Sequence, residues 1–253
     1  MVDIWKVVIP ELTGEDERNV YLYLPEDYRF DTEIRYPVLY MFDGHNVFFD
    51  SHATYGKCWG LKEYMDRTKT PMLICAVECN HSADHGRLKE YAPFSFSDES
   101  LGRITGKGDI TMKWMTKTLK PYIDENYRTL PERENTYIAG SSMGGLMSIY
   151  AAVKYNKVFS KAAALSPSLW ACPEQLEKLI QSKRLDPDTV IYMDYGSEEM
   201  DYRKGMDHTF CEIASLLVQK RVHVTSRVIP NGTHTESSWE KQLPFVFSTL
   251  LYE

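Results

Sequence analysis

The sequence lacks any long apolar run. No stretch of its 253 residues approaches the roughly 20 consecutive apolar residues that a membrane-spanning helix requires. The first residues, MVDIWKVVIP, do not show the charged segment followed by an apolar one that is typical of a secretory leader. We therefore expect a soluble, cytoplasmic protein with no membrane partner.

The sequence also lacks a basic cluster. Asp and Glu number 36 against 29 Lys and Arg, which gives a formal net charge of −7. Surfaces that bind nucleic acid carry a patch or stripe of Lys and Arg. We therefore predict no nucleic-acid partner, and the sequence leaves open whether the chain forms a homo-oligomer.

Cysteine is scarce, and its spacing shows no disulfide framework. The five cysteines are Cys58, Cys75, Cys79, Cys172 and Cys211. An odd number without regular spacing, in a chain large enough to fold without cross-links, indicates reduced thiols. Because 43% of the residues are hydrophobic, the chain can bury one large core, and we predict a single domain over residues 1–253.

Short runs rich in Val, Ile and Tyr alternate with longer amphipathic runs. The predicted strands are residues 4–10, 19–25, 37–42, 71–78, 136–140, 161–166, 189–196 and 223–229. The predicted helices are residues 59–68, 110–127, 143–155, 173–183, 207–220 and 237–252. This alternation predicts an α/β fold with a mostly parallel central sheet, helices on both faces and an antiparallel N-terminal hairpin. Residues 81–108 show no clear period, and such loops are often functional.

Two adjacent serines stand where a predicted strand gives way to a predicted helix, in TYIAGSSMGGLMSIYAA (136–152). The α/β-hydrolase nucleophile occupies a strained turn of this kind in the pattern G-x-S-x-G. Ser142 is flanked by Gly140 and Gly144, whereas Ser141 has alanine and methionine at those positions. Ser142 is the predicted nucleophile; the alternative is a glycine-rich junction with incidental serines.

A serine hydroxyl needs a histidine base, which in turn needs a carboxylate that fixes its tautomer. In α/β-hydrolases the chain order is serine, acid, histidine. Four of the seven histidines precede Ser142, while His208 opens a predicted helix and His223 lies in a predicted strand. His234, in a polar loop after the last predicted strand, is the predicted base.

The acid should follow the predicted strand 189–196. The loop there offers Glu198, Glu199 and Asp201, while Asp194 is still inside the strand. The sequence pattern alone does not identify which of these residues is the acid.

The oxyanion formed by serine attack needs two backbone N–H donors. One is that of Met143, which follows the predicted nucleophile. The second should come from YMFDGHNVFFD (40–50), where an apolar strand ends in an Asp-Gly pair, and we assign it to the amide of His45.

Several segments resemble the putative-esterase family of α/β-hydrolases, which includes enterochelin, feruloyl, acetyl-xylan and tributyrin esterases, S-formylglutathione hydrolases and mycolyltransferases. They are FDGHNVF (42–48), GRLKEYAP (86–93), 119–152, FSKAAALSPSLW (159–170), YMDYGSEE (192–199) and GTHTESSW (232–239). The resemblance runs from about residue 4 to the last predicted helix and implies the α/β-hydrolase fold with ester-hydrolysing activity.

The resemblance also assigns the site residues. The family's G-x-S-x-G falls on Ser142 and its G-x-H on His234, and its acid, three positions after a strand-end glycine, falls on Glu199. Many members carry Asp there, so Glu198 stays as the alternative. The GLTC segment of S-formylglutathione hydrolases is replaced by DGHN, which disfavours that subfamily.

Two further features concern the pocket and metals. The resemblance suggests Trp170 for the substrate pocket, and Tyr91 in the aperiodic loop is a second candidate; both are equally compatible with packing roles. Cys79, His81 and His85 are residue types that bind soft metals, but no second spaced pair accompanies them. We predict neither a metal nor another cofactor.

These observations favour a serine carboxylesterase that forms an acyl-enzyme on a small or aromatic acyl ester, such as an acetyl, feruloyl, short-chain or siderophore ester. Its partner is a small-molecule ester substrate. The alternatives are an acyltransferase that uses the same site and a catalytically silent binding module that has kept the fold.

Overall fold

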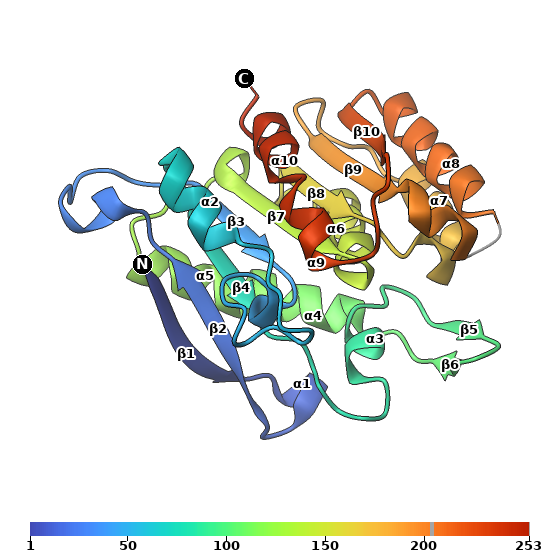
Figure 1. Cartoon of the computed structure of the whole chain (residues 1–253), viewed down its shortest axis with the longest axis horizontal. Coiled ribbons are helices and arrows are strands. Elements are labelled where there is room, and N and C mark those ends of the chain that lie inside the picture. Colours follow the sequence, from blue (N-terminus) through green and yellow to red (C-terminus); the bar gives the residue numbers. More distant parts are fainter. Residues whose placement is uncertain (203–204, 253) are drawn as a thin grey trace.

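The computed structural model describes residues 1–202 and 205–252, apart from the side chains of residues 200–202. Its centre is an eight-stranded sheet with the order β1-β2-β4-β3-β7-β8-β9-β10 (Figure 1). The strands are β1 (Val2–Val8), β2 (Glu17–Tyr23), β3 (Val38–Met41), β4 (Leu73–Val77), β7 (Thr136–Ser141), β8 (Lys161–Leu165), β9 (Val190–Gly196) and β10 (His223–Ile229). Each overlaps one of the eight predicted runs, with boundaries that differ by a few residues.

The sheet is antiparallel at one edge and parallel elsewhere. β1 pairs antiparallel with β2, and β2 pairs antiparallel with β4. From β4 through β3, β7, β8 and β9 to β10, every pair is parallel. The predicted fold class, including the antiparallel N-terminal hairpin, is confirmed. Because parallel strands share one direction, the carboxyl ends of β3, β4, β7, β8 and β9 meet at one edge of the sheet.

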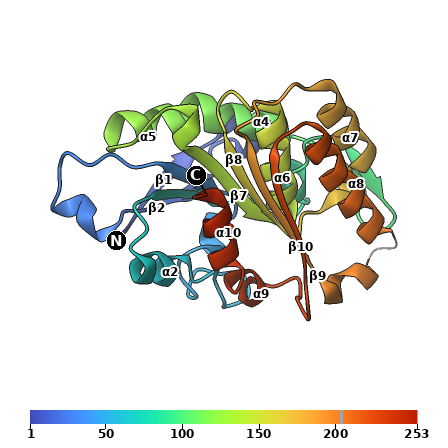
Figure 2. The ribbon, with the colours of Figure 1, turned by 90° about the horizontal axis from the view of Figure 1, so that it is seen from above.

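Helices cover both faces of the sheet (Figure 2). One face carries α4 (Gly108–Trp114), a π turn (Met115–Leu119), α5 (Lys120–Asn126), α6 (Met143–Lys154), α7 (Pro173–Ser182) and α8 (Met206–Gln219). The other carries α2 (Leu61–Thr68), α9 (Glu236–Glu240) and α10 (Leu243–Leu250). A hydrophobic core lies on each face of the sheet. Successive strand residues point to opposite faces, so Tyr40 packs in the core beneath α4–α8 and Leu39 in the core beneath α2, α9 and α10.

The structure subdivides two of the predicted segments. The expected C-terminal helix divides into α9 and α10, with Pro244 in the first turn of α10. Proline has no N–H to continue a helix but fits the first turn of a new one. The aperiodic stretch 81–108 contains helix α3 (Gly86–Glu90) and the hairpin β5 (Phe96–Asp98) and β6 (Gly102–Ile104), all too short to show a period.

The structure bears on two predictions, which concern membrane-spanning helices and the cysteines. In the described residues, no helix is both long and apolar enough to cross a bilayer. All five cysteines, each of which lies in the described part, are free thiols, as predicted; only Cys211 is exposed.

A buried ion pair ties the N-terminal hairpin to α3. Arg18 on β2 donates from Nη1 to Glu90 Oε1 at 2.6 Å, and the two side chains are only 4% and 2% exposed. Burial raises the pKa of Glu90, while Arg18 acts in the opposite direction. Helix α3 also carries Arg87, which binds Asp43 in the turn after β3. The ion pair therefore fixes the position of the helix that holds this turn.

Arg18→Met should destabilise the fold by about 3–5 kcal/mol, because it leaves the Glu90 carboxylate buried without a cation. Urea unfolding followed by circular dichroism measures this free energy. The control is Lys6→Met, which breaks the exposed pair of Lys6 with Glu17 and should leave the unfolding midpoint unchanged. Equal midpoints for the two variants would contradict the proposed importance of the buried pair.

Candidate active site

Ser142 occupies the sharp turn between β7 and α6. Its backbone has φ 59° and ψ −124°, a conformation that is strained for any residue other than glycine. Tight packing around the turn maintains it: a Cβ added to Gly140 would lie 2.7 Å from the backbone of Gly144. This close approach explains why glycines flank the serine. Ser141, by contrast, is the buried last residue of β7.

His234 and Glu199 meet beside this turn. His234 Nδ1 lies 2.6 Å from Glu199 Oε2. His234 is in the loop between β10 and α9, and Glu199 is in a 3-10 turn (Ser197–Tyr202) that follows β9. Glu199 is 1% exposed, whereas Glu198 is exposed, and its carboxylate accepts a hydrogen bond from the hydroxyl of the neighbouring Ser197 at 3.3 Å. Of these two predicted acids, the structure brings Glu199 to the histidine; the Asp201 side chain lies outside the described residues.

A second set of hydrogen bonds holds the Glu199 carboxylate. Its Oε1 accepts from Ser166 Oγ at 2.7 Å and from the Gly196 N–H at 3.0 Å. Ser166 Oγ in turn accepts from Trp239 Nε1 at 2.9 Å, and the Trp239 ring packs edge-on against His234 at 5.1 Å. These contacts fix the carboxylate and the imidazole relative to one another. Asp194, which lies inside β9, accepts hydrogen bonds from the Tyr192 hydroxyl and from the Ser166 N–H instead.

Ser142 and His234 line the same pocket, which has a volume of about 800 Å³. In the described part of the chain, the hydrogen bond of the Ser142 hydroxyl is to Ser168 Oγ at 3.3 Å rather than to His234. Catalytic hydrogen bonds are often long without substrate and shorten in the complex. Ser168 therefore holds the hydroxyl at the pocket wall.

The predicted oxyanion donors both lie at helix N-termini. Met143 is the first residue of α6, and His45 is in the short 3-10 turn Gly44–Asn46 after β3. The first N–H groups of a helix have no partner within it, so they can bind an anion. A Cβ on Gly44 would lie 2.7 Å from the Ala76 carbonyl oxygen, so only glycine lets this turn approach β4 so closely.

Arg87 and Tyr91 support that turn. Arg87 donates two 2.7 Å hydrogen bonds to the Asp43 carboxylate, and the Asp43 N–H donates to the Tyr91 hydroxyl at 3.1 Å. Burial opposes ionisation of Asp43, but the Arg87 charge outweighs it and holds the pKa of the carboxyl below its usual range. Asp43 is therefore a fixed anion that orients the turn carrying His45.

The two pocket residues suggested by the sequence do not line this cavity. Tyr91 is buried next to Asp43, and its hydroxyl accepts the hydrogen bond from the Asp43 N–H. Trp170 packs edge-on against Phe96 at 5.6 Å. The described pocket wall instead includes Asn46, Tyr55, Lys57 and His81.

Cys79 and His81 come together with His45 rather than with His85. In the described residues, these three side chains form a group whose potential ligand atoms lie within 4.8 Å of one another. These residues meet because β3 and β4 pair in parallel, which brings the segments that follow both strands together. Ser166, Ser168 and Trp239 were not predicted from the sequence, although the segment SPSLW (166–170) after a predicted strand contains two of them.

Known proteins resemble this chain in sequence and in fold. A curated relative, the uncharacterized protein YbbA of Bacillus subtilis (strain 168), is 30% identical over 187 residues, 72% of this chain and 69% of its own. A solved ferulic acid esterase has a TM-score of 0.70 at 20% identity, covering 97% of both chains. An IroE-like serine hydrolase from Shewanella oneidensis has a TM-score of 0.74 at 19% identity, covering 99% of this chain and 79% of its own.

The family comparison covers nearly the whole sequence. Residues 12–249 match the model of the Esterase family, described as "Putative esterase". The family assignment made from the sequence is confirmed, and with it the assignment as an enzyme, a hydrolase of the carboxylesterase type. The chain belongs to the putative-esterase family, whose fold it shares with the esterases of known structure.

Proposed function

We propose that the chain hydrolyses carboxylic esters through a covalent acyl-enzyme on Ser142. The observation that carries the proposal is the 2.6 Å contact between His234 and the buried Glu199, at the edge of a pocket that Ser142 also lines. Glu199 accepts from Nδ1–H, which leaves Nε2 of the imidazole unprotonated and able to act as a base.

In the first half-reaction, His234 Nε2 takes the Ser142 proton while Oγ attacks the ester carbonyl carbon. The carbonyl electron pair moves onto oxygen, and the amides of His45 and Met143 donate to the resulting oxyanion. When the intermediate collapses, the bond to the alcohol oxygen breaks and the imidazolium protonates the leaving alcohol. Ser142 then carries the acyl group as an ester.

In the second half-reaction, water replaces the alcohol. His234 removes a proton from the water as it attacks the acyl carbon, and the same two amides stabilise the second oxyanion. Collapse breaks the bond to Ser142 Oγ, which regains its proton from His234, and the carboxylic acid leaves. No step of this scheme requires a cofactor.

For the substrate, we propose a small-molecule ester with a small or aromatic acyl group, such as an acetyl, short-chain, feruloyl or siderophore ester. A pocket of about 800 Å³ accommodates such groups. The solved ferulic acid esterase with this fold, whose name denotes an aromatic acid, is consistent with this choice. We place the reaction in the cytoplasm, in a single domain over residues 1–253.

An acyltransferase would use the same first half-reaction and differ only in the attacking alcohol, so analysis of the products with added alcohols distinguishes it. A silent binding module is disfavoured, because it would not need a strained serine, a buried glutamate and a histidine around one pocket.

Ser142→Ala should lower kcat/KM by on the order of a million-fold, because it removes the nucleophile. Ser141→Ala is the matched control and should keep most of the activity, since Ser141 ends β7 and provides no attacking oxygen. Initial rates with an acetyl ester measure both, and thermal melting shows that both fold. If Ser141→Ala were the inactive variant, the assigned nucleophile would be wrong.

Glu199→Gln should lower kcat about 10³- to 10⁴-fold. The glutamine amide would face His234 Nδ1 as a donor and force the imidazole into the tautomer with its proton on Nε2. Glu198→Gln, the exposed neighbour, should match the parent. Rates with the same ester, together with thermal melts, test this pair, and a severe loss confined to Glu198→Gln would assign the acid to Glu198 instead.

A further inference from the structure

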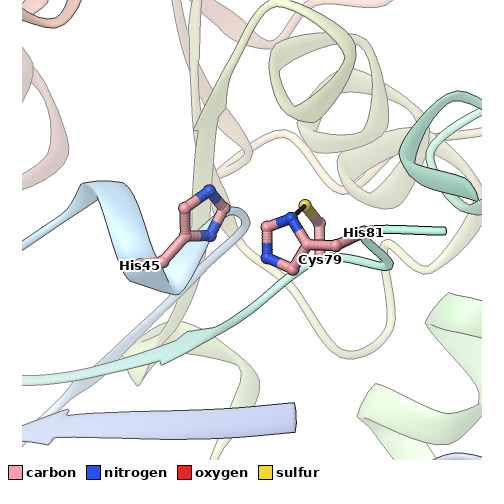
Figure 3. A group of neighbouring side chains, drawn as sticks. All are labelled: His45, Cys79 and His81. Carbon is pink, nitrogen blue, oxygen red and sulfur yellow. Dashed lines mark hydrogen bonds between the residues drawn. The ribbon is translucent and has the colours of Figure 1, made fainter. Parts of the chain in front are cut away.

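A cluster of one thiol and two imidazoles lines the pocket, and the proposed hydrolysis does not use its side chains. His45 comes from the turn after β3, while Cys79 and His81 follow β4 (Figure 3). The Cys79 Sγ lies 4.0 Å from His81 Nδ1, and the rings of His45 and His81 meet edge-on with centroids 4.7 Å apart. The potential ligand atoms of all three lie within 4.8 Å of one another.

Hydrogen bonds orient both imidazoles toward this cluster. His45 Nε2 lies 3.0 Å from Thr54 Oγ1, and His81 Nε2 lies 3.1 Å from Glu78 Oε1. When each Nε2–H donates to its oxygen partner, each Nδ1 keeps a free lone pair. His45 is only 5% exposed, and its Nδ1 is buried without a hydrogen-bond partner among the described residues. A buried, unpaired imidazole nitrogen is costly unless a ligand occupies the space before it.

We propose that His45, Cys79 and His81 bind a thiophilic divalent transition-metal ion, for which Zn²⁺ is the best match. Zinc takes Cys sulfur at about 2.3 Å and His nitrogen at about 2.0–2.1 Å, so tetrahedral nitrogen and sulfur donors lie roughly 3.3–3.6 Å apart. The separations of up to 4.8 Å would therefore have to shorten by up to about 1.5 Å on binding. Three protein ligands leave a fourth position for water or for an oxygen of a pocket ligand.

Charged residues of both signs surround the cluster. Zn²⁺ binds the thiolate form of cysteine, so the Cys79 thiol proton passes to solvent as the metal–sulfur bond forms. Asp43 and Glu78 then provide nearby negative charge, while Arg87 and Arg18 are the nearby cations.

This site lies beside the proposed reaction centre but does not depend on it. His45 would bind the metal through its side chain and the oxyanion through its backbone amide. Cys79, His81 and Ser142 line the same pocket. The inference therefore goes beyond the proposed ester hydrolysis and is tested by metal binding rather than by activity.

The test uses the full chain, stripped with a chelator and kept reduced with a phosphine. Calorimetric titration with Zn²⁺ should give one ion per chain, and Co²⁺ should give the near-ultraviolet charge-transfer band of a thiolate ligand. Cys79→Ser should remove the band and weaken Zn²⁺ binding at least about 100-fold. Thr54→Val, which removes only the partner of His45, should weaken it about 10- to 100-fold.

Three variants complete the design. Cys211→Ser, which removes the exposed thiol, should bind Zn²⁺ like the parent. His81→Gln provides a second ligand variant in case Cys79→Ser misfolds, because the His81 side chain is 55% exposed and its replacement disturbs little packing. His234→Ala should lose ester hydrolysis but keep the zinc stoichiometry.

Absence of stoichiometric binding, equal affinity in Cys79→Ser and Cys211→Ser, or loss of binding only in His234→Ala would overturn the proposed site. Ester hydrolysis by the stripped parent protein should persist, since the proposed mechanism uses a histidine base and backbone donors. Failure of metal binding with intact hydrolysis would therefore reject this inference alone and leave the proposed function standing.

Discussion

The chain turns sharply after three parallel strands through residues with positive φ, and the candidate site depends on these strained turns. Asp43 after β3 has φ 57°, Ser142 after β7 has φ 59°, and Ser166 after β8 has φ 43°. Such conformations cost about 1–3 kcal/mol each and persist where the surrounding packing determines them. The first turn directs the His45 amide, the second the Ser142 hydroxyl, and the third the Ser166 hydroxyl toward Glu199. The packing that maintains these three strained turns thus also fixes the positions of the reacting groups.

Much of this architecture could be predicted from the sequence. The strands were recognisable because buried parallel strands form short apolar runs between amphipathic segments, and TYIAG and TVIYMDYG show this clearly. Ser142 could be singled out because its turn admits only small residues two positions away on either side, and Ser141 has a methionine at one of them. His234 followed from chain order, and its hydrogen bond to Glu199 agrees with that reasoning.

What could not be predicted depends on contacts between segments far apart in the chain. Ser166 reaches Glu199 and Trp239 only because β8 pairs with β9 and because α9 packs over the strand ends. His45 joins Cys79 and His81 rather than His85 because β3 and β4 are neighbours in the sheet. The subdivided C-terminal helix and the short hairpin in residues 81–108 carry too few residues for a period to reveal them.

The central claim is that Ser142 is the residue acylated during ester hydrolysis. Reaction of the protein with a fluorophosphonate, followed by digestion and tandem mass spectrometry, identifies the modified side chain directly. The account predicts one phosphonyl group per chain, located on Ser142, with labelling slowed by prior incubation with an ester substrate. An adduct on Ser141 or Ser168, or a chain that hydrolyses esters yet remains unlabelled, would contradict it.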